Sequence, residues 1–191
     1  MNIMEAIEQR RSIRKFRDAP IPDEVVENII GAATLAPSGK NRQPWRFIVV
    51  RQDKRAEMVR TMREGIARFR ERGTDPGSSE WTATVMEQAP VTVFVFNDGA
   101  EYAQMPRDIG GFFMNSVDVQ SIGAAIQNML LAALDMGVGS LWICDVLYAY
   151  EELCNWLGQT HQMIAAVSFG YTDEQPKARP RKSVGEVTEW R

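Results

Sequence analysis

The chain has 191 residues, of which 45% are hydrophobic and 25% charged, and its formal net charge is −3. This is the composition of an ordinary soluble globular protein, and the length suits one domain over residues 1–191. The mildly acidic balance argues against a nucleic-acid partner. The longest apolar stretch, residues 122–134, contains Gln127 and Asn128 and is too short to span a membrane.

Two features indicate the compartment. Residues 1–9 lack the apolar core of a secretory signal. The two cysteines, Cys144 and Cys154, would allow one bridge but do not suggest a disulfide framework. We therefore expect a cytoplasmic protein.

In the first half of the chain, apolar spacing and turn residues predict helices, loops and one strand. Asp23 suits the N-cap of a helix that should end before Pro37, because the residue before a proline avoids the α region. The expected elements are a helix at 3–10, an extended segment at 12–16, a connector at 18–22, a helix from 23, a loop at 37–44, a strand at 45–50 and a helix at 54–72.

In the second half, the run PVTVFVF at 90–96 predicts a strand that is buried on both faces. Ser116 or Asp118 is expected to cap the most apolar helix, which should end near Met136. Its apolar residues go nearly all the way round, so it should lie in the core or against another subunit. The remaining expected elements are a strand at 139–143, a helix at 151–157 closed by Gly158, and a strand at 163–170.

The whole pattern places helices around four or five short strands. The order is not a strict alternation of strand and helix, which favours a single α+β domain over a doubly wound sheet.

Catalytic groups carried by the protein itself are scarce. His161 is the only histidine, and its place after an expected helix end favours a loop or capping role. Cys144 and Cys154 are interpreted as small buried apolar residues. The sequence offers no nucleophile elbow, zinc-ligand spacing or phosphate-binding glycine loop. Such a chain is either a binding protein or an enzyme whose cofactor carries the chemistry.

Positive charge gathers at both ends of the chain. Residues 10–17, RRSIRKFR, have five basic side chains in eight positions, and residues 177–182, KARPRK, have four in six. Between positions 85 and 176 there are eleven acidic residues and one basic residue. This distribution favours an anion site, with solvated surface charge as the alternative for either cluster alone.

The spacing within the two clusters supports an anion site. Arg10, Ser12 and Arg14 alternate, as do Arg179 and Arg181, so an extended backbone would present each set on one side. Arginine forks match phosphate oxygens in pairs, and a serine hydroxyl adds a further donor.

A third candidate cradle is the loop PSGKNRQPW at 37–45. Ser38, Asn41 and Gln43 offer partners for the polar edge of a heterocycle, and Gly39 would allow close approach of the backbone. An ordinary capped loop between a helix and a strand is the alternative.

Four blocks of the sequence, RRSIRKF, APSGKNRQPWRFIVV, MGVGSLWI and VSFGYTDEQPKARPRK, follow the order found in the nitroreductase family of FMN-dependent oxidoreductases. The chain resembles this family over nearly its whole length. The resemblance implies an α+β, nitroreductase-like fold with a central, mostly antiparallel sheet. It also implies an intertwined homodimer that exchanges terminal segments and holds two FMN sites at its interface.

The resemblance further implies ping-pong catalysis. NADH or NADPH would deliver hydride to flavin N5, and the reduced flavin would pass electrons to a nitroaromatic, a quinone or a related small acceptor. The flavin supplies the chemistry, so no catalytic side chain is expected from the protein.

Carried over residue by residue, the resemblance implies a cofactor site built from four segments. Backbone groups of the strand that begins at Ser140, rather than its side chains, would face the flavin ring, and the 37–43 loop would come from the partner subunit. The implied FMN-binding residues are Arg10, Ser12 and Arg14, with Arg11 matching less closely, then Pro37, Ser38, Gly39, Asn41 and the adjacent Gln43, then Leu141, Trp142 and Ile143, and finally Arg179 and Arg181.

The resemblance leaves the acceptor open. Cys144 and Asp145 stand where many relatives have glycine or an acidic residue, so the hydrogen bond to N5 does not carry over. Reductive dehalogenation, flavin destruction and ring-forming dehydrogenation occur on related scaffolds, and a non-enzymatic flavin-binding or sensory module is a further alternative. Candidate pocket residues are Trp81, Met105, Phe112 and Phe113, for which ordinary packing is the simpler interpretation.

Overall fold

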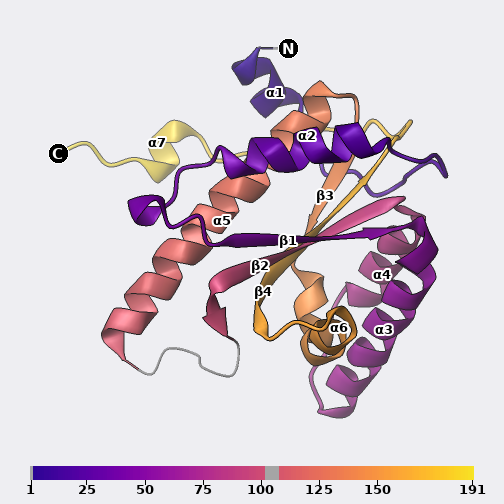
Figure 1. The fold of residues 1–191 in the computed structure, drawn as a ribbon. Coiled ribbons are helices and arrows are strands. Elements are labelled where there is room, and N and C mark those ends of the chain that lie inside the picture. The colour runs from indigo at the N-terminus through magenta and orange to yellow at the C-terminus, as the bar shows by residue number, and fades with distance from the viewer. Residues whose placement is uncertain (1, 102–107) are drawn as a thin grey trace.

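The computed structural model describes residues 2–101 and 108–191, and its centre is a four-stranded sheet (Figure 1). The strand order is β1-β2-β4-β3, and all three pairings are antiparallel. The strands are β1 (Trp45–Arg51), β2 (Val91–Glu101), β3 (Gly139–Ile143) and β4 (His161–Gly170). The α+β class predicted from the sequence pattern and the antiparallel sheet implied by the family resemblance are both confirmed.

Helices cover both faces of this sheet (Figure 1). One face packs against α2 and α5, and the other packs against α3, α4 and α6. The helices are α1 (Ile3–Gln9), α2 (Asp23–Thr34), α3 (Gln52–Glu71), α4 (Ser79–Gln88), α5 (Ile109–Asp135), α6 (Tyr150–Leu157) and α7 (Val184–Val187), and the 3-10 turns are η1 (Gly39–Asn41) and η3 (Asp145–Ala149).

The alternation of side chains along β2 explains why its apolar run is continuous. Val91, Val93 and Val95 enter the cluster beneath α2 and α5, whereas Phe94 and Phe96 enter the cluster beneath α3 and α4. Successive strand residues point to opposite faces, so a strand that is covered on both sides needs apolar residues at every position. The predicted two-sided burial of this strand is confirmed.

The start of α5 differs from the sequence prediction. The helix begins at Ile109 rather than near Ser116, and Asp108 caps it by accepting a hydrogen bond from the Gly111 N–H at 2.7 Å. Asp118 is therefore not a cap but a buried residue inside the helix. The first turn was not predicted because the Gly110-Gly111 pair disfavours helix. The Asp108 cap offsets the cost of these two glycines.

Among the described residues, α5 is also the one helix whose length and apolar composition would allow it to cross a membrane. Its buried residues, from Asp118 to Ala133, pack against α2 and the sheet. The core position predicted for this helix is confirmed for that part of it.

Three smaller predictions were wrong, and one helix was missed. Pro22, not Asp23, occupies the N-cap of α2, and Asp23 is the first helical residue. His161 is the first residue of β4 rather than a loop or capping residue, because the strand begins two residues before its apolar run. Cys144 is exposed, while Cys154 is buried as expected. The helix α4 was not predicted at all.

Candidate functional site

The two ends of the chain run side by side beyond the edge strand β3. Ile13 donates its N–H to the Ser140 carbonyl at 2.9 Å, and Ser12 forms a parallel bridge with Ser140. The N–H groups of Arg14 and Lys15 both donate to the Glu174 carboxylate, at 2.6 and 3.1 Å. These contacts hold the segment after α1 against both β3 and the start of the C-terminal tail.

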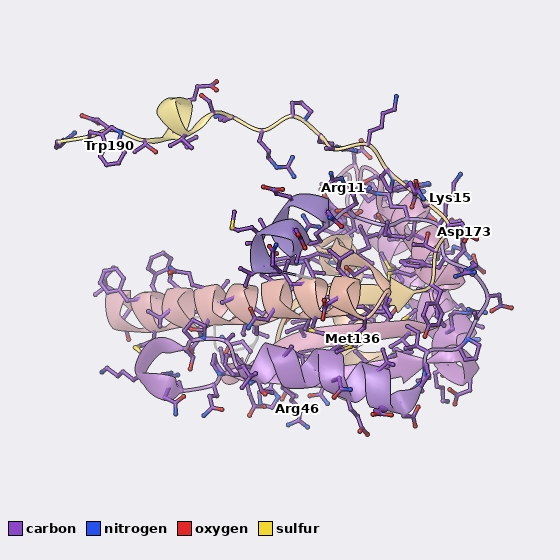
Figure 2. The ribbon with its side chains drawn as sticks, turned by 90° about the horizontal axis from the view of Figure 1, so that it is seen from above. Arg11, Lys15, Arg46, Met136, Asp173 and Trp190 are labelled. Atoms are coloured by element: carbon purple, nitrogen blue, oxygen red, sulfur yellow. The ribbon has the colours of Figure 1, made fainter. Side chains whose placement is uncertain are left out.

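The tail then passes the N-terminal segment and leaves the body of the protein. Figure 2 shows Arg11, Lys15 and Asp173 gathered at one end of the molecule and the tail running clear of the sheet to Trp190. Every residue after Pro176 is exposed.

Between the two segments lies a pocket of about 450 Å³. The structure places residues from both predicted cationic clusters in its wall, although Lys15, Arg17 and Lys182 do not line it. The lining residues are Ile7, Glu8, Arg10, Arg11, Ser12, Arg14, Pro176, Lys177, Ala178, Arg179 and Arg181. Every N-terminal and C-terminal candidate residue of the sequence analysis is therefore part of one pocket.

The arginines of this pocket have no carboxylate partners among the described residues. Arg11 donates to the carbonyls of Glu8 and Arg10, Arg14 to that of Ser12, and Arg181 to those of Arg179 and Pro180. Most of their five donors each are therefore free for a ligand.

The charges in the pocket also repel one another. Burial lowers the pKa of the Arg10 guanidinium, and the charges of Arg181 and Arg11 lower it further. A dianionic phosphate in this place would relieve the repulsion and accept several charge-assisted hydrogen bonds. The donor set therefore fits the phosphate of a nucleotide or flavin mononucleotide.

The strand β3 runs beside the N-terminal wall of the pocket, to which the Ser12–Ser140 bridge joins it. Leu141 and Ile143 point their side chains into the core, whereas Trp142 is partly exposed. Because β3 is an edge strand, its backbone beyond the Ser12 bridge has no strand partner on that side among residues 2–101 and 108–191. The side chains of Leu141 and Ile143 are thus unavailable to a ligand, and only backbone groups and Trp142 remain.

The loop at 37–44 does not join the arginine pocket within one chain. It lies between α2 and β1, beside α5 (Figure 1), and its candidate residues do not line the pocket. Gly39 fits flat against α5: its N–H donates to Ser121 Oγ at 3.3 Å, and a Cβ on it would lie 2.3 Å from Val117. The side chains of Asn41 and Gln43 are exposed.

The backbone of this loop is unusual. Lys40, Asn41 and Gln43 have φ angles of 53°, 54° and 48°, in the left-handed region. Residues other than glycine adopt this conformation at a cost of about 1–2 kcal/mol each, so the surrounding structure must hold the loop in place. Strained backbone of this kind concentrates at binding sites.

One contact that the sequence analysis missed holds the loop. Arg42 forms a two-pronged ion pair with Asp118 of α5, with Nε–Oδ1 and Nη2–Oδ2 distances of 3.1 and 3.0 Å. The signal was present, because Asp118 is the only charged residue between positions 109 and 134. A single carboxylate in an apolar, buried helix is costly unless it is paired, so it indicates a hydrogen-bonding or charged partner.

A second missed feature is the start of α4, which lies against the site from the other side. The Arg14 guanidinium stands over the Trp81 ring, 5.7 Å from its centroid. Thr82 and Ser78 both donate hydroxyl hydrogen bonds to the Asp145 carboxylate, directly after β3. Phe112 and Phe113 are exposed on α5, and Met105 lies outside the described residues.

With this geometry established, comparison with known proteins identifies the family. A sequence model of the nitroreductase family matches residues 7–171, a span that runs from α1 to the end of β4. The chain belongs to the nitroreductase family.

Individual nitroreductase-family proteins agree with this assignment. The chain is 31% identical over 185 residues to a Methanothermobacter thermautotrophicus protein named "Putative NADH dehydrogenase/NAD(P)H nitroreductase", covering 94% of this chain and 82% of that protein. A Desulfovibrio desulfuricans crystal structure, described as a "putative nitroreductase in complex with fmn", superposes with a TM-score of 0.76 at 28% identity and covers 100% of this chain and 98% of its own.

Another similar protein has a specialised activity in its name. An iodotyrosine deiodinase from Hydra vulgaris is 29% identical over 198 residues and covers 93% of this chain and 68% of that protein. The proteins similar to this chain therefore carry names of more than one reaction.

Proposed function

We propose that this nitroreductase-family protein is an FMN-dependent oxidoreductase that uses NADH or NADPH as its electron donor. The observation that carries the proposal is the pocket in which five arginines and Ser12, from both ends of the chain, face one another without carboxylate partners among the described residues. The FMN in the Desulfovibrio structure and the NAD(P)H nitroreductase name of the Methanothermobacter relative support the choice of cofactor and donor.

Different residues of the site would bind different parts of FMN. Arg10, Arg14 and Arg181 would bind the phosphate, and Ser12 would donate a further hydrogen bond. The backbone of β3 at Leu141, Trp142 and Ile143 would lie behind the ring. Once bound, FMN supplies hydride transfer in two separate half-reactions, first from NADH or NADPH and then to the acceptor.

A complete site would need a second subunit. The apolar residues of α1, the first half of α5 and the C-terminal tail are exposed in a single chain, including Ile3, Met4, Ile7, Ile109, Phe112, Phe113, Val184, Val187 and Trp190. Exposed apolar surface of this extent marks a protein interface. We place the partner's loop, with Pro37, Ser38, Gly39, Asn41 and Gln43, over the flavin of an intertwined homodimer.

The acceptor is proposed as a nitroaromatic, a quinone or a related small aromatic. Trp81, which contacts Arg14, and Trp142 of β3 offer exposed flat apolar surface near the site, and an exposed Phe112 would reach it only from the partner subunit of the proposed dimer. Reductive dehalogenation is the second candidate, because the Hydra relative is named as a deiodinase. Both cysteines are free thiols, which fits the reducing cytoplasm.

A spectroscopic experiment tests the proposal. The purified protein, reconstituted with FMN, should show flavin absorbance that bleaches without oxygen when NADH or NADPH is added and returns when a nitroaromatic or quinone follows. A protein that cannot bind FMN would overturn the proposal. A protein that binds FMN but is reduced by neither nicotinamide would instead be a non-enzymatic flavin-binding module.

A further inference from the structure

The ion pair between Arg42 and Asp118 joins the 37–44 loop to α5. The proposed site requires a fixed position of this loop relative to that helix. Asp118 belongs to α5 and its side chain is 3% exposed, whereas Arg42 belongs to the 37–44 loop and is 38% exposed. The backbone at Gly99 covers the pair so closely that a Cβ there would lie 3.0 Å from Asp118 Oδ2 and 3.2 Å from Arg42 Nη2. The pair is therefore enclosed on the α5 side and aligned in both of its hydrogen bonds.

Arg42 stands in the middle of the strained part of the loop. Lys40 and Asn41 precede it and Gln43 follows it, all with positive φ, while Arg42 itself has φ of −70°. The Ser38 hydroxyl accepts a hydrogen bond from the Gln43 N–H at 3.0 Å, but this bond lies within the loop. It cannot fix the loop relative to α5.

Two contacts do fix it. One is the neutral bond from the Gly39 N–H to Ser121 Oγ, which is long at 3.3 Å. The other is the bidentate pair of Arg42 and Asp118, the one charged anchor among the described contacts of the loop. Charge-assisted, two-pronged pairs specify geometry more tightly than single neutral bonds.

We infer that Arg42 and Asp118 are positioning residues, which hold the loop in the shape that presents Ser38, Gly39 and Asn41 to the flavin. Neither residue is assigned a contact with the cofactor, and their effect would be transmitted through the loop backbone. The inference rests on the proposed function for its consequence, which is FMN affinity. The geometry of the loop in the apo-protein is a consequence that does not require FMN.

Asp118→Asn and Arg42→Lys test the inference. The first keeps the shape of the side chain and removes its charge, and the second keeps the charge and removes the fork. We expect Asp118→Asn to raise the Kd for FMN about tenfold, as it would if the ordered loop fell to about a tenth of the population. Arg42→Lys should give a smaller rise in the same direction. Amide exchange at Gly39, Asn41 and Gln43 should quicken in both apo-variants.

A matched ion pair provides the control. Arg68 and Glu152 join α3 to α6 at 3.0 Å, with the Glu152 side chain 10% exposed. Glu152→Gln and Arg68→Lys should affect thermal stability without changing the Kd for FMN or the exchange of the loop amides. A purely structural role for Arg42 and Asp118 would give the same pattern as this control.

The results separate the inference from the proposed function. Wild-type FMN affinity and unchanged loop exchange in both variants would overturn the positioning role. If the wild-type protein bound no FMN, the proposed function would fail, and loop exchange in the apo-variants would still decide the inference. If Asp118→Asn did not fold, Arg42→Lys would carry the same two measurements.

Discussion

Arg10 occupies the place where the two ends of the chain meet, with Arg181 and Arg11 close enough to lower its pKa after burial has done so. A cation that is held near other cations is stabilised by a bound anion. The same residue lines the pocket with Ser12, Arg14 and Arg181. At the scale of single residues, the proposed site is therefore a group of mutually repelling arginine charges that a bound phosphate would stabilise.

Removing one of these charges should weaken FMN binding. We expect Arg10→Ala or Arg181→Ala to cost about 1.5–3 kcal/mol, because each removes a charge-assisted contact. Fluorescence titration of apo-protein with FMN measures the change. Arg60→Ala is the matched control, because Arg60 pairs with Glu64 on the outer face of α3 and does not line the pocket. Unchanged affinity in both pocket variants would refute the two-ended phosphate site.

Cys144 offers a pH-dependent test of the residues after β3. Although the residue is exposed, its thiol is partly desolvated; this desolvation raises the pKa of the thiol, and the Asp145 carboxylate raises it further. Only the thiolate reacts, so alkylation of the apo-protein should be slow at neutral pH and should quicken as the pH rises. Burial raises the pKa of Cys154 to about 11, so this thiol should react more slowly still.

Asp145→Asn should lower the pKa of Cys144 and move its alkylation profile toward lower pH. Mass spectrometry of the Cys144 peptide after timed iodoacetamide exposure gives the rate at each pH. A profile that stayed at the wild-type position would show that Asp145 does not act on this thiol.

At the scale of elements, Glu174 holds the N-terminal segment to the C-terminal one. Its carboxylate accepts the N–H groups of both Arg14 and Lys15, and its own N–H donates to Thr172 Oγ1. Glu174→Ala should lower the free energy of unfolding by about 1–3 kcal/mol, because two backbone donors lose their partner. It should also weaken FMN binding, because Arg14 loses its anchor.

The neighbouring residue supplies the control for Glu174. Asp173 forms a long, exposed ion pair with Arg17 at 3.7 Å. Exposed pairs contribute little, so Asp173→Ala should leave both stability and FMN affinity close to wild type. Equal effects of the two substitutions, measured by thermal unfolding and FMN titration, would contradict the anchoring role of Glu174.

The sequence predicted elements best where local pattern and tertiary setting agreed. The β2 run and the Gly158 end of α6, which has φ of 64°, needed no knowledge of distant residues. The first turns of α5 could not be predicted from local pattern, because Gly110 and Gly111 disfavour helix. The lone charge of Asp118 indicated that it needed a partner, but local pattern could not identify that partner, because Arg42 is 76 residues away.

The candidate site likewise has a part that local sequence pattern predicted and a part that depends on tertiary packing. Alternating spacing within each end of the chain indicated two donor rows, and the structure brings both rows to one pocket. The position of the 37–44 loop away from that pocket could not be derived from spacing. It depends on how α2, β1 and α5 pack and, in the proposed dimer, on a second chain.

At the scale of the whole molecule, a single chain exposes more apolar surface on α1, the first half of α5 and the C-terminal tail than is usual for a monomer. Trp190 is 88% exposed at the end of a tail that leaves the body (Figure 2). Deletion of residues 183–191 should weaken the proposed dimer, which sedimentation velocity would show as a larger monomer fraction. Leu35→Ala removes an exposed apolar side chain at the C-cap of α2, away from the tail, and should not change the monomer fraction. A full-length protein that is monomeric at micromolar concentration would contradict the dimer.

If the arginine pocket binds the phosphate of FMN, the protein should distinguish FMN from riboflavin. The two ligands share the flavin ring and differ only in the phosphate, so their affinities for the apo-protein isolate what the arginines contribute. We predict that FMN binds at least about tenfold more tightly than riboflavin, and that Arg10→Ala or Arg181→Ala narrows the gap. Equal affinity for the two ligands in the wild-type protein would contradict the account.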